Sequence, residues 1–275
     1  MFGEIFDWLT TPCPAEARKL GYLREAIAIK ARHRRHRQAW QPHLDRTKAL
    51  IERSMAAAAK RRRAVVLGSG PLLDVPVASL ARTFEAVDLI DLVHPKAARH
   101  IAAAYSNVTL RTEDISGVSV SLAAMPKDAA QAPQLGSPPM LSEDTDFVVS
   151  VNLLSQLPDI PAQWLGARTA LIEPARKAFA RRLVRCHLDW LLGLDALVCL
   201  VTDVERRYVE RDGTELPAWD SLQGETLPPA TDIWTWDVAP AGETHPDLAV
   251  RMTVHGFADF AAAAQRGAAA RGIGN

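Results

Sequence analysis

The sequence predicts an α/β fold: a doubly wound, mostly parallel sheet of about seven strands that carries an N-terminal helical extension. The first observation is a series of short apolar runs, which are typical of strands covered on both faces. The second is a glycine turn directly after the first of these runs, and the third is helical periodicity between the runs. These features divide the 275 residues into an extension over 1–62, a sheet domain over 63–260 with an inserted loop at about 117–144, and a flexible tail over 261–275.

The first strand and the turn that follows it are the most informative stretch. Ala64–Leu67 is an apolar run led by valines, and Gly68-Ser69-Gly70 follows at once. Glycines at this place let a backbone turn sharply and let a ligand approach closely. A second strand over Ala86–Ile90 ends in Asp91, which lies 21 residues beyond Gly70. An acid at this distance is typical of a side chain that binds a ribose diol, so the stretch predicts a nucleoside site.

The loop that follows the glycine turn argues against a dinucleotide. A dinucleotide site needs a third glycine where this chain has Leu73. Asp74 stands where the next helix is expected to begin, with Pro76 in its first turn, so we expect Asp74 to cap that helix. Its carboxylate would occupy the helix N-terminus that otherwise holds a phosphate. S-adenosylmethionine has no phosphate and ends in an ammonium group that an acid can hold, so it fits this loop better.

Two later strands end in polar side chains. Val108–Arg111 is a third strand, closed by Glu113 and Asp114, and Asn152 follows a central strand over Phe147–Val151. Open α/β sheets bind ligands at the carboxyl ends of their strands, which makes Asp114 and Asn152 candidate ligand contacts. The alternative for each is a residue that only forms the loop.

The chain resembles the class I S-adenosylmethionine-dependent methyltransferases, which have a Rossmann-like domain. The resemblance covers roughly residues 60–255. It lies in four segments that follow one another in order: VVLGSGP (65–71), VDLIDL (87–92), LRTEDIS (110–116) and TDFVVSVNLLSQLP (145–158). The chain departs from the family at Val66, where an acid is usual, and at Leu72, where a glycine is usual.

The resemblance implies S-adenosylmethionine as the cofactor and assigns roles to the strand ends. Asp91 would bind the ribose, and Asp114 would lie at the adenine. The complete set of predicted cofactor-binding residues is Gly68, Ser69, Gly70, Asp74, Asp91, Asp114 and Asn152. Methyl transfer is an in-line displacement in which the protein mainly aligns the reactants, so the catalytic residues stay unknown. Asp203, His94 and His187 are candidate bases without a signal that favours one of them.

The C-terminal half continues the alternation of helix and strand. Residues 161–193 read as one long helical region, and Ala196–Thr202 reads as a fifth strand that ends at Asp203. Asp232–Ala239 and Leu248–His255 are expected to form the antiparallel pair that closes the sheet in methyltransferases. Trp219, Trp234 and Trp236 are expected to pack in the core and on the sheet face.

The N-terminal extension reads as two helices, Ala15–Arg37 and His43–Ala59, interrupted by Pro42. Residues 1–63 hold 15 Lys and Arg against 6 Asp and Glu, although the whole chain is neutral. The excess concentrates in residues 30–37 and 60–63. These runs leave nucleic acid as an open partner, and the alternative is a solvated basic face that packs on the acidic main domain.

Composition narrows the class and the compartment. The chain is 48% hydrophobic and 23% charged, as in ordinary globular proteins, and no apolar run approaches a membrane span. The acidic, aromatic N-terminus is unlike a secretory signal. Cys13, Cys186 and Cys199 are odd in number without metal spacing, which favours free thiols in the cytoplasm. Four arginines surround His33 and His36, so we expect no metal site.

These features predict a cytoplasmic S-adenosylmethionine-dependent methyltransferase that acts on a small molecule rather than on nucleic acid. One alternative is a non-catalytic protein that keeps the methyltransferase fold for binding or regulation, and Val66 and Leu72 favour it. A less favoured alternative is an NAD(P)-dependent oxidoreductase. The acceptor and the oligomeric state are left open.

Overall fold

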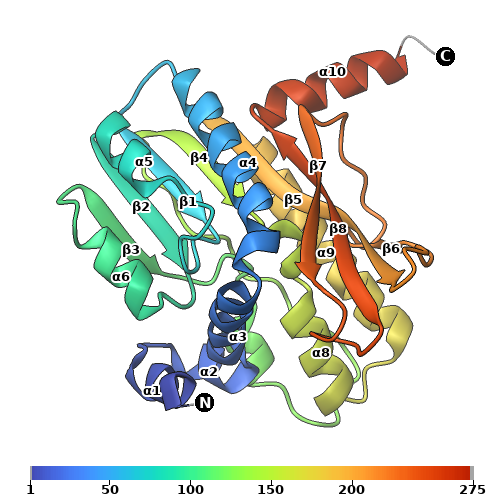
Figure 1. Ribbon diagram of the computed structural model, residues 1–275. Coiled ribbons are helices and arrows are strands. Elements are labelled where there is room, and N and C mark those ends of the chain that lie inside the picture. The colour runs from blue at the N-terminus through green and yellow to red at the C-terminus, as the bar shows by residue number, and fades with distance from the viewer. Residues whose placement is uncertain (1, 273–275) are drawn as a thin grey trace.

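The computed structural model describes residues 2–272, with side chains described over 4–269, and confirms the predicted fold class (Figure 1). Its centre is one eight-stranded sheet. The strands are β1 (Arg63–Leu67), β2 (Ala86–Asp91), β3 (Val108–Thr112), β4 (Thr145–Val151), β5 (Leu197–Glu210), β6 (Trp219–Asp220), β7 (Asp232–Ala239) and β8 (Leu248–Phe257). The short β6 pairs only with β5.

The strand order is β3-β2-β1-β4-β5-β8-β7, and the pairs from β3 to β5 are all parallel. The strand β8 runs antiparallel to both β5 and β7, as expected for the closing pair. The chain therefore winds outward from β1 in two directions, and the order of the strands reverses between the neighbours β1 and β4. Open α/β sheets bind ligands at the carboxyl ends of the strands at such a switch point. Because parallel strands all point the same way, the ends of β1 to β4 meet at one edge.

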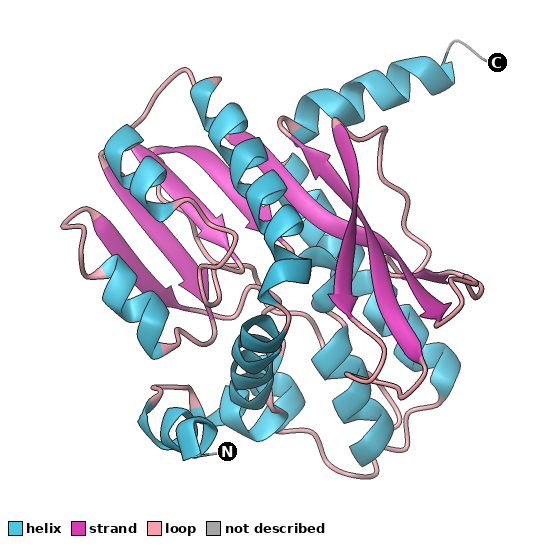
Figure 2. Cartoon of the chain, in the orientation of Figure 1, coloured by secondary structure: helices cyan, strands magenta, loops and turns pink. Residues whose placement is uncertain are grey.

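Helices cover both faces of the sheet, and Figure 2 shows the strands as one layer with α4 (Arg37–Ala56) in front of it. On β1, Val66 faces the core shared with α4, whereas Val65 and Leu67 face the opposite core. All three side chains are fully buried, and each such burial stabilises the fold by about 1.5–3 kcal/mol. The front face also carries α5 (Val77–Thr83) and α6 (Lys96–Ala102), and the back face carries α9 (Glu173–Leu192) and α10 (Phe260–Gly272).

The N-terminal extension is helical, but its breaks lie elsewhere than predicted. Its first three helices are α1 (Phe2–Thr10), α2 (Ala15–Leu20) and α3 (Tyr22–Arg35). The prediction that Pro42 interrupts the helix is wrong, since Pro42 lies inside α4 and the break falls at His36. A proline inside a helix removes one backbone hydrogen bond, and the burial of Trp40, His43 and Leu44 around Pro42 offsets this loss. Gly21 separates α2 from α3 in the left-handed conformation, with φ at 105°.

Three other segments differ from the prediction. The strand β5 does not end at Asp203 but continues to Glu210 through an irregularity between Asp203 and Glu205. The helical region after 160 is broken into α8 (Asp159–Arg168) and α9. Over Phe260–Gly272 the chain forms α10, a helix that was not predicted, with Phe260 and Ala263 buried in the back core; residues 273–275 of the predicted tail lie outside the described residues.

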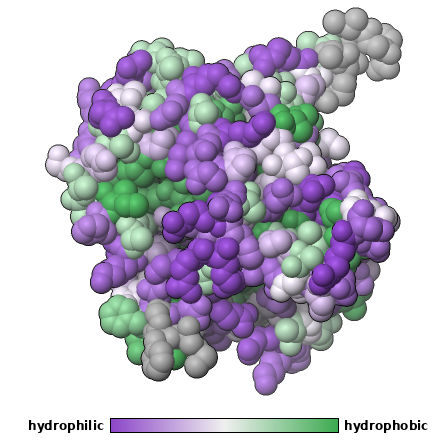
Figure 3. Space-filling model, in the orientation of Figure 1, coloured by the Kyte–Doolittle hydropathy of each residue, from purple (hydrophilic) through white to green (hydrophobic). Residues whose placement is uncertain are grey.

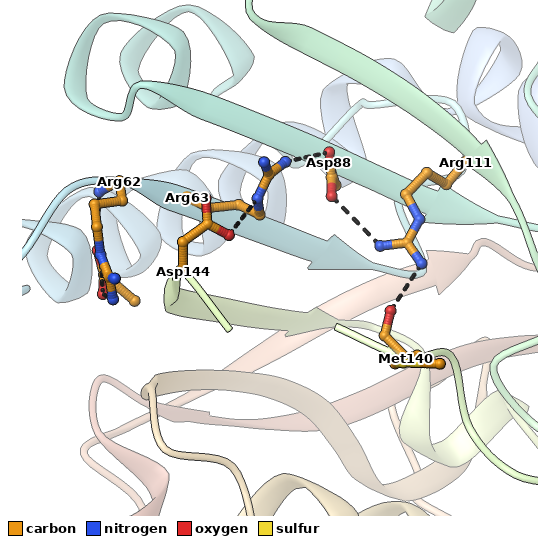
Figure 4. A network of polar contacts seen from close by, with 7 residues as sticks. Arg62, Arg63, Asp88, Arg111, Met140 and Asp144 are labelled. Atoms are coloured by element: carbon orange, nitrogen blue, oxygen red, sulfur yellow. Dashed lines mark hydrogen bonds and ion pairs between the residues drawn. The ribbon is translucent and has the colours of Figure 1, made fainter. Parts of the chain in front are cut away.

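The inserted loop is held to the sheet by polar contacts. It contains α7 (Ser119–Ala123) and otherwise runs without helix or strand to β4. In Figure 4, the Asp88 carboxylate lies between Arg63 (3.1 Å) and Arg111 (3.4 Å). Arg111 also donates to the backbone carbonyl of Met140 (3.0 Å), and Arg63 donates to Asp144 (2.8 Å). These contacts fix the loop against β1 to β3.

Candidate functional site

The glycine turn after β1 has the sharp geometry that its sequence predicts. Gly68 and Gly70 both have positive φ, 76° and 45°. A side chain at Gly68 would have its Cβ 2.9 Å from Leu153 Cβ and 3.2 Å from the Val151 carbonyl oxygen, so only glycine fits there. Leu72 also has positive φ, 60°, at the place where the related family usually has glycine. Its buried side chain packs in the front core, which offsets the unfavourable backbone.

Asp91 ties the ends of β1 and β2 together. One carboxylate oxygen accepts from the backbone N–H of Gly70 (2.8 Å), and the other accepts from the N–H of Val93 (3.1 Å). Burial raises the pKa of Asp91, and the two backbone donors and the nearby His94 oppose that rise. Each carboxylate oxygen has a second lone pair, so the group keeps acceptor capacity toward a ligand.

Asp114 holds the loop after β3 in the same region. Its carboxylate accepts from the backbone N–H groups of Ser116 (2.9 Å) and Ser119 (2.6 Å). Glu113 is drawn to Arg111 (2.7 Å). Burial raises the pKa of the Tyr22 hydroxyl, and the charge of Asp114 raises it further. The loop-forming role weighed for Asp114 is therefore present, and the residue also lines a cavity.

That cavity, of about 140 Å³, lies at the carboxyl ends of β2 and β3. Gly70, Asp91 and Asp114 line it, and α3 closes it with Tyr22 and Ile29. A second cavity of about 220 Å³ continues from it past the glycine turn toward β5 and β7. The two share seven lining residues: Glu25, Ile29, Gly70, Pro71, Asp91, Leu153 and Gln156. The structure thus brings all seven predicted site residues to the walls of two adjoining cavities.

Asp74 does not cap a helix, and this prediction is wrong. The helix α5 begins at Val77, with Pro76 at its cap position and no side-chain cap. The Asp74 carboxylate instead accepts from Asn152 Nδ2 (2.6 Å), across the cavity wall. Burial raises the pKa of Asp74, and the bond from Asn152 opposes that rise. Asn152 has φ 47°, which turns its side chain back toward the glycine loop.

Asn152 connects Asp74 to the N-terminal extension. Asn152 Nδ2 also lies 3.1 Å from His43 Nε2, and Trp234 Nε1 donates to His43 Nδ1 (3.1 Å). Burial lowers the pKa of His43 to about 3, so its imidazole stays neutral. The same ring stacks on Trp236 at 4.0 Å between centroids. Trp234 and Trp236 are core residues as predicted, whereas Trp219 is 66% exposed on β6.

The far end of the second cavity contains charged residues that the sequence did not single out. Asp159 begins α8, and Arg206 lies on β5 beyond the strand end that was predicted. Desolvation by the surrounding protein raises the pKa of Asp159 to about 6; repulsion from Asp203 and Glu25 adds to this rise, and attraction by Arg206 opposes it. The residue nevertheless keeps contact with solvent, and it lines the second cavity. No sequence motif marks Asp159 or Arg206, because only the fold brings them together.

The three candidate bases have structural partners. His187 lies 2.9 Å from Ser150 Oγ in the back core, and burial lowers its pKa to about 3. Asp203 is buried and accepts from Ser155 Oγ, while His94 contacts the Arg111 carbonyl oxygen (3.0 Å). None of the three is among the residues that line the two cavities.

The basic runs of the extension pair with acids elsewhere in the chain. In residues 30–37, Arg35 and His36 both contact Glu243, in the turn between β7 and β8. In residues 60–63, Arg62 pairs with Asp146. Residues 4–269 hold no group of three metal-binding side chains, and none of the described helices has the length and apolar character needed to cross a membrane. The three cysteines are free, and burial raises the pKa of Cys199 to about 12.

A scan against models of known protein families finds no match, and a search of curated proteins finds none. Solved structures similar to this chain include DhpI bound to S-adenosylhomocysteine, with 16% identity, 83% of this chain and 93% of that chain covered, and a TM-score of 0.32. For the N-methyltransferase NodS of Bradyrhizobium japonicum the identity is 14%, the coverage 76% and 85%, and the TM-score 0.35. The 1,6-didemethyltoxoflavin-N1-methyltransferase of Burkholderia thailandensis has 13% identity and a TM-score of 0.38, and the match covers 90% of this chain and 92% of that chain.

The arrangement of the strands identifies the fold by itself. Parallel strands wind outward from β1 in both directions, and a reversed strand is inserted beside β5 before the last one. This is the closing pair that the resemblance to methyltransferases implies. The chain has a Rossmann-like fold with this closing pair.

Proposed function

We propose that the protein is an S-adenosylmethionine-dependent methyltransferase that acts on a small molecule. The observation that carries this proposal is the pair of adjoining cavities at the carboxyl ends of β1 to β4, with the Asp91 carboxylate where they meet. A nucleoside would lie in the first cavity and the reacting end of the cofactor in the second. When bound, S-adenosylmethionine supplies a methyl group activated on a sulfonium.

The chain's own residues would hold the cofactor along this path. Asp91 accepts from the ribose hydroxyls, and the loop at Asp114 borders the adenine. Asp74 and Asn152 face the methionine end, where the cofactor's ammonium gives the buried Asp74 carboxylate a charged partner. Beside the glycine turn the wall holds the acids Asp74 and Asp91, and the turn itself contains no Lys or Arg that could bind a pyrophosphate, which disfavours NAD and NADP.

A small acceptor is favoured over nucleic acid because three arginines of the basic runs, Arg35, Arg62 and Arg63, are engaged in ion pairs with acids of the main domain. The second cavity is also closed on several sides by Trp40, Trp236 and Met252. Pockets of this kind enclose small ligands rather than track a backbone.

The first experiment is calorimetric titration of the protein with S-adenosylmethionine and S-adenosylhomocysteine, beside NAD and NADP. We expect one site for each sulfur compound and none for either dinucleotide. Failure of both sulfur compounds to bind folded protein at millimolar concentration would contradict the proposal. Binding without release of S-adenosylhomocysteine from any pool of small acceptors would instead point to a non-catalytic binding protein.

Asp91→Ala tests the ribose contact. Hydrogen bonds to a charged group contribute about 1.5–3 kcal/mol, so we expect the dissociation constant for S-adenosylhomocysteine to rise roughly 10- to 150-fold. Asp237→Ala, on the outer strand β7 in an exposed pair with Arg251, is the matched control and should bind as the wild type does. Equal affinity of the Asp91 variant and the wild type would show that Asp91 does not bind the ribose.

A further inference from the structure

The second cavity gathers polar atoms that have no partner. Among the described residues, twelve buried side-chain nitrogen or oxygen atoms lack a hydrogen bond. Five of them belong to residues that line this one cavity: Arg32, Ser69, Asn152, Arg206 and Trp236. A buried polar atom without a partner destabilises a fold by about 1–3 kcal/mol, so such a concentration is typical of a site whose partners arrive with a ligand.

Two of these residues stand in one row of the sheet. Arg206 on β5 pairs with Met252 on β8, and Met252 pairs with Trp236 on β7. Side chains of directly paired residues project from the same face of a sheet, and all three line the cavity. The Arg206 Nε–H and the Trp236 indole N–H can only donate hydrogen bonds, so a ligand at this wall of the cavity has to accept them.

Asp159, at the start of α8, lines the same cavity. Its carboxyl is attracted by Arg206, yet within the described residues no ion pair joins the two. An acid and a guanidinium that border one cavity without meeting leave room for a group between them. That group has to accept from Arg206 and donate to Asp159.

We propose that this end of the cavity binds a methyl acceptor that carries a carboxylate beside an N–H or O–H group. Arg206 and Trp236 bind the carboxylate, and Asp159 accepts the proton of the neighbouring N–H or O–H. The inference rests on the proposed function and names the substrate class of the same site. In the transfer, the acceptor's nitrogen or oxygen forms a bond to the methyl carbon, and the bond from that carbon to sulfur breaks with its electron pair left on sulfur. The acceptor's proton passes to the Asp159 carboxylate.

The test uses the full chain saturated with S-adenosylhomocysteine and three probes: 2-aminobenzoate, its neutral amide 2-aminobenzamide, and benzoate. Calorimetry should show 2-aminobenzoate binding at least tenfold more tightly than the amide. Arg206→Met should abolish this preference. Trp236→Phe, which keeps an aromatic side chain but removes the indole N–H, should reduce the preference several-fold. The control is Arg207→Met: Arg207 lies next to Arg206 on β5 and pairs with Glu215, and its loss should leave the preference for the carboxylate unchanged.

The comparison with benzoate tests Asp159. The amino group should tighten binding several-fold in the wild type, and Asp159→Ala should remove that gain while the preference for a carboxylate over an amide persists. The inference is overturned when the carboxylate and the amide bind equally, when neither binds, or when Arg206→Met keeps the preference. Saturation with S-adenosylhomocysteine is measured first, so a protein that fails to bind it contradicts the proposed function, whereas one that binds it without a carboxylate preference contradicts only this inference.

Discussion

Gly68 is the residue at which backbone and packing constrain the site together. Its φ of 76° suits glycine, and an added Cβ would press on Leu153 and on the Val151 carbonyl. We expect Gly68→Ala to lower the free energy of unfolding by about 2–4 kcal/mol, from backbone strain and overpacking combined. Urea denaturation measures the change.

The control for this substitution is Gly213, which has φ 92° and nothing within 4 Å of an added Cβ. Gly213→Ala should therefore show backbone strain alone, about 1–2 kcal/mol. Equal costs at the two positions would mean that the contact with Leu153 relaxes without penalty.

His187 gives the stability a pH dependence. Its pKa is about 3 in the folded protein because of burial, whereas an unfolded chain has about 6.5. The folded protein therefore binds fewer protons below pH 6.5, so this contribution is complete above pH 6.5 and is lost as the pH falls toward 3. The loss is about 1.4 kcal/mol per pH unit for one such group.

The variant His187→Gln, whose amide can still bond to Ser150, should unfold with a pH slope shallower by this amount between pH 6 and 4. Urea titrations at several pH values measure the slope. Above pH 7 the two slopes should coincide, and identical slopes at pH 5 would mean that the folded protein protonates His187 freely.

At this scale the sequence predicts which residues lie at the candidate site better than it predicts what their side chains contact. Every predicted site residue lies at the two cavities because strand ends and glycine turns are local signals. The partner of Asp74 is Asn152, 78 residues away, so a rule about helix caps cannot find it. Asp159 and Arg206 carry no local signal at all.

At the scale of elements, the arginines around Asp88 join β1, β2 and β3 across their buried side. The Asp88 side chain is 7% exposed, and those of Arg63 and Arg111 are 24% and 22% exposed. Asp88→Ala should lower the free energy of unfolding by about 1–3 kcal/mol, less than for a fully buried pair because Arg63 keeps Asp144 and Arg111 keeps Glu113. Thermal or urea denaturation measures the loss.

The exposed pair of Asp237 and Arg251 provides the comparison, with side chains 60% and 40% exposed. Asp237→Ala should cost about 0–1 kcal/mol, because solvent screens such pairs. A loss at Asp88 no larger than this would show that the three strands do not depend on the network in Figure 4.

Prediction of elements succeeded where burial is periodic. Asp232–Ala239 is found with the predicted bounds, and its buried residues alternate along the strand. The extension of β5 to Glu210 was missed because its outer half is charged and only half-buried, so no apolar run marks it. The helix α10 was missed because its alanines gain their burial from Phe260 and the sheet, a tertiary effect.

At the scale of the whole molecule, the N-terminal extension covers the two cavities. In Figure 1 the helix α3 lies near the arrowhead of β2, and its residues Glu25 and Ile29 border both cavities. Figure 3 shows this face as mostly polar over α3 and α4, with a hydrophobic area between the positions of α5 and α6. Ion pairs of Arg32, Arg35 and His36 with Glu243 join the end of α3 to the turn between β7 and β8.

We expect bound S-adenosylhomocysteine to slow amide hydrogen exchange in α3. A ligand that fills the cavities adds contacts beneath the helix and lowers the population of its open state. The rates over Tyr22–Arg35 should fall at least tenfold at saturation, while α10, on the opposite face, should exchange as before. Equal protection in α3 and α10 would indicate that the ligand stabilises the whole protein and does not lie beneath α3 in particular.

The division of the sheet between parallel and antiparallel strands has a consequence for redesign. The residues proposed for the cofactor follow the parallel strands β1, β2, β3 and β4, whereas the row of Arg206, Met252 and Trp236 lies on β5, β8 and β7. Random substitution along that row should yield enzymes that modify other molecules while their demand for the methyl donor stays the same. In the proposed enzyme, the strands that would choose the acceptor are thus separate from the strands that would hold the methyl donor.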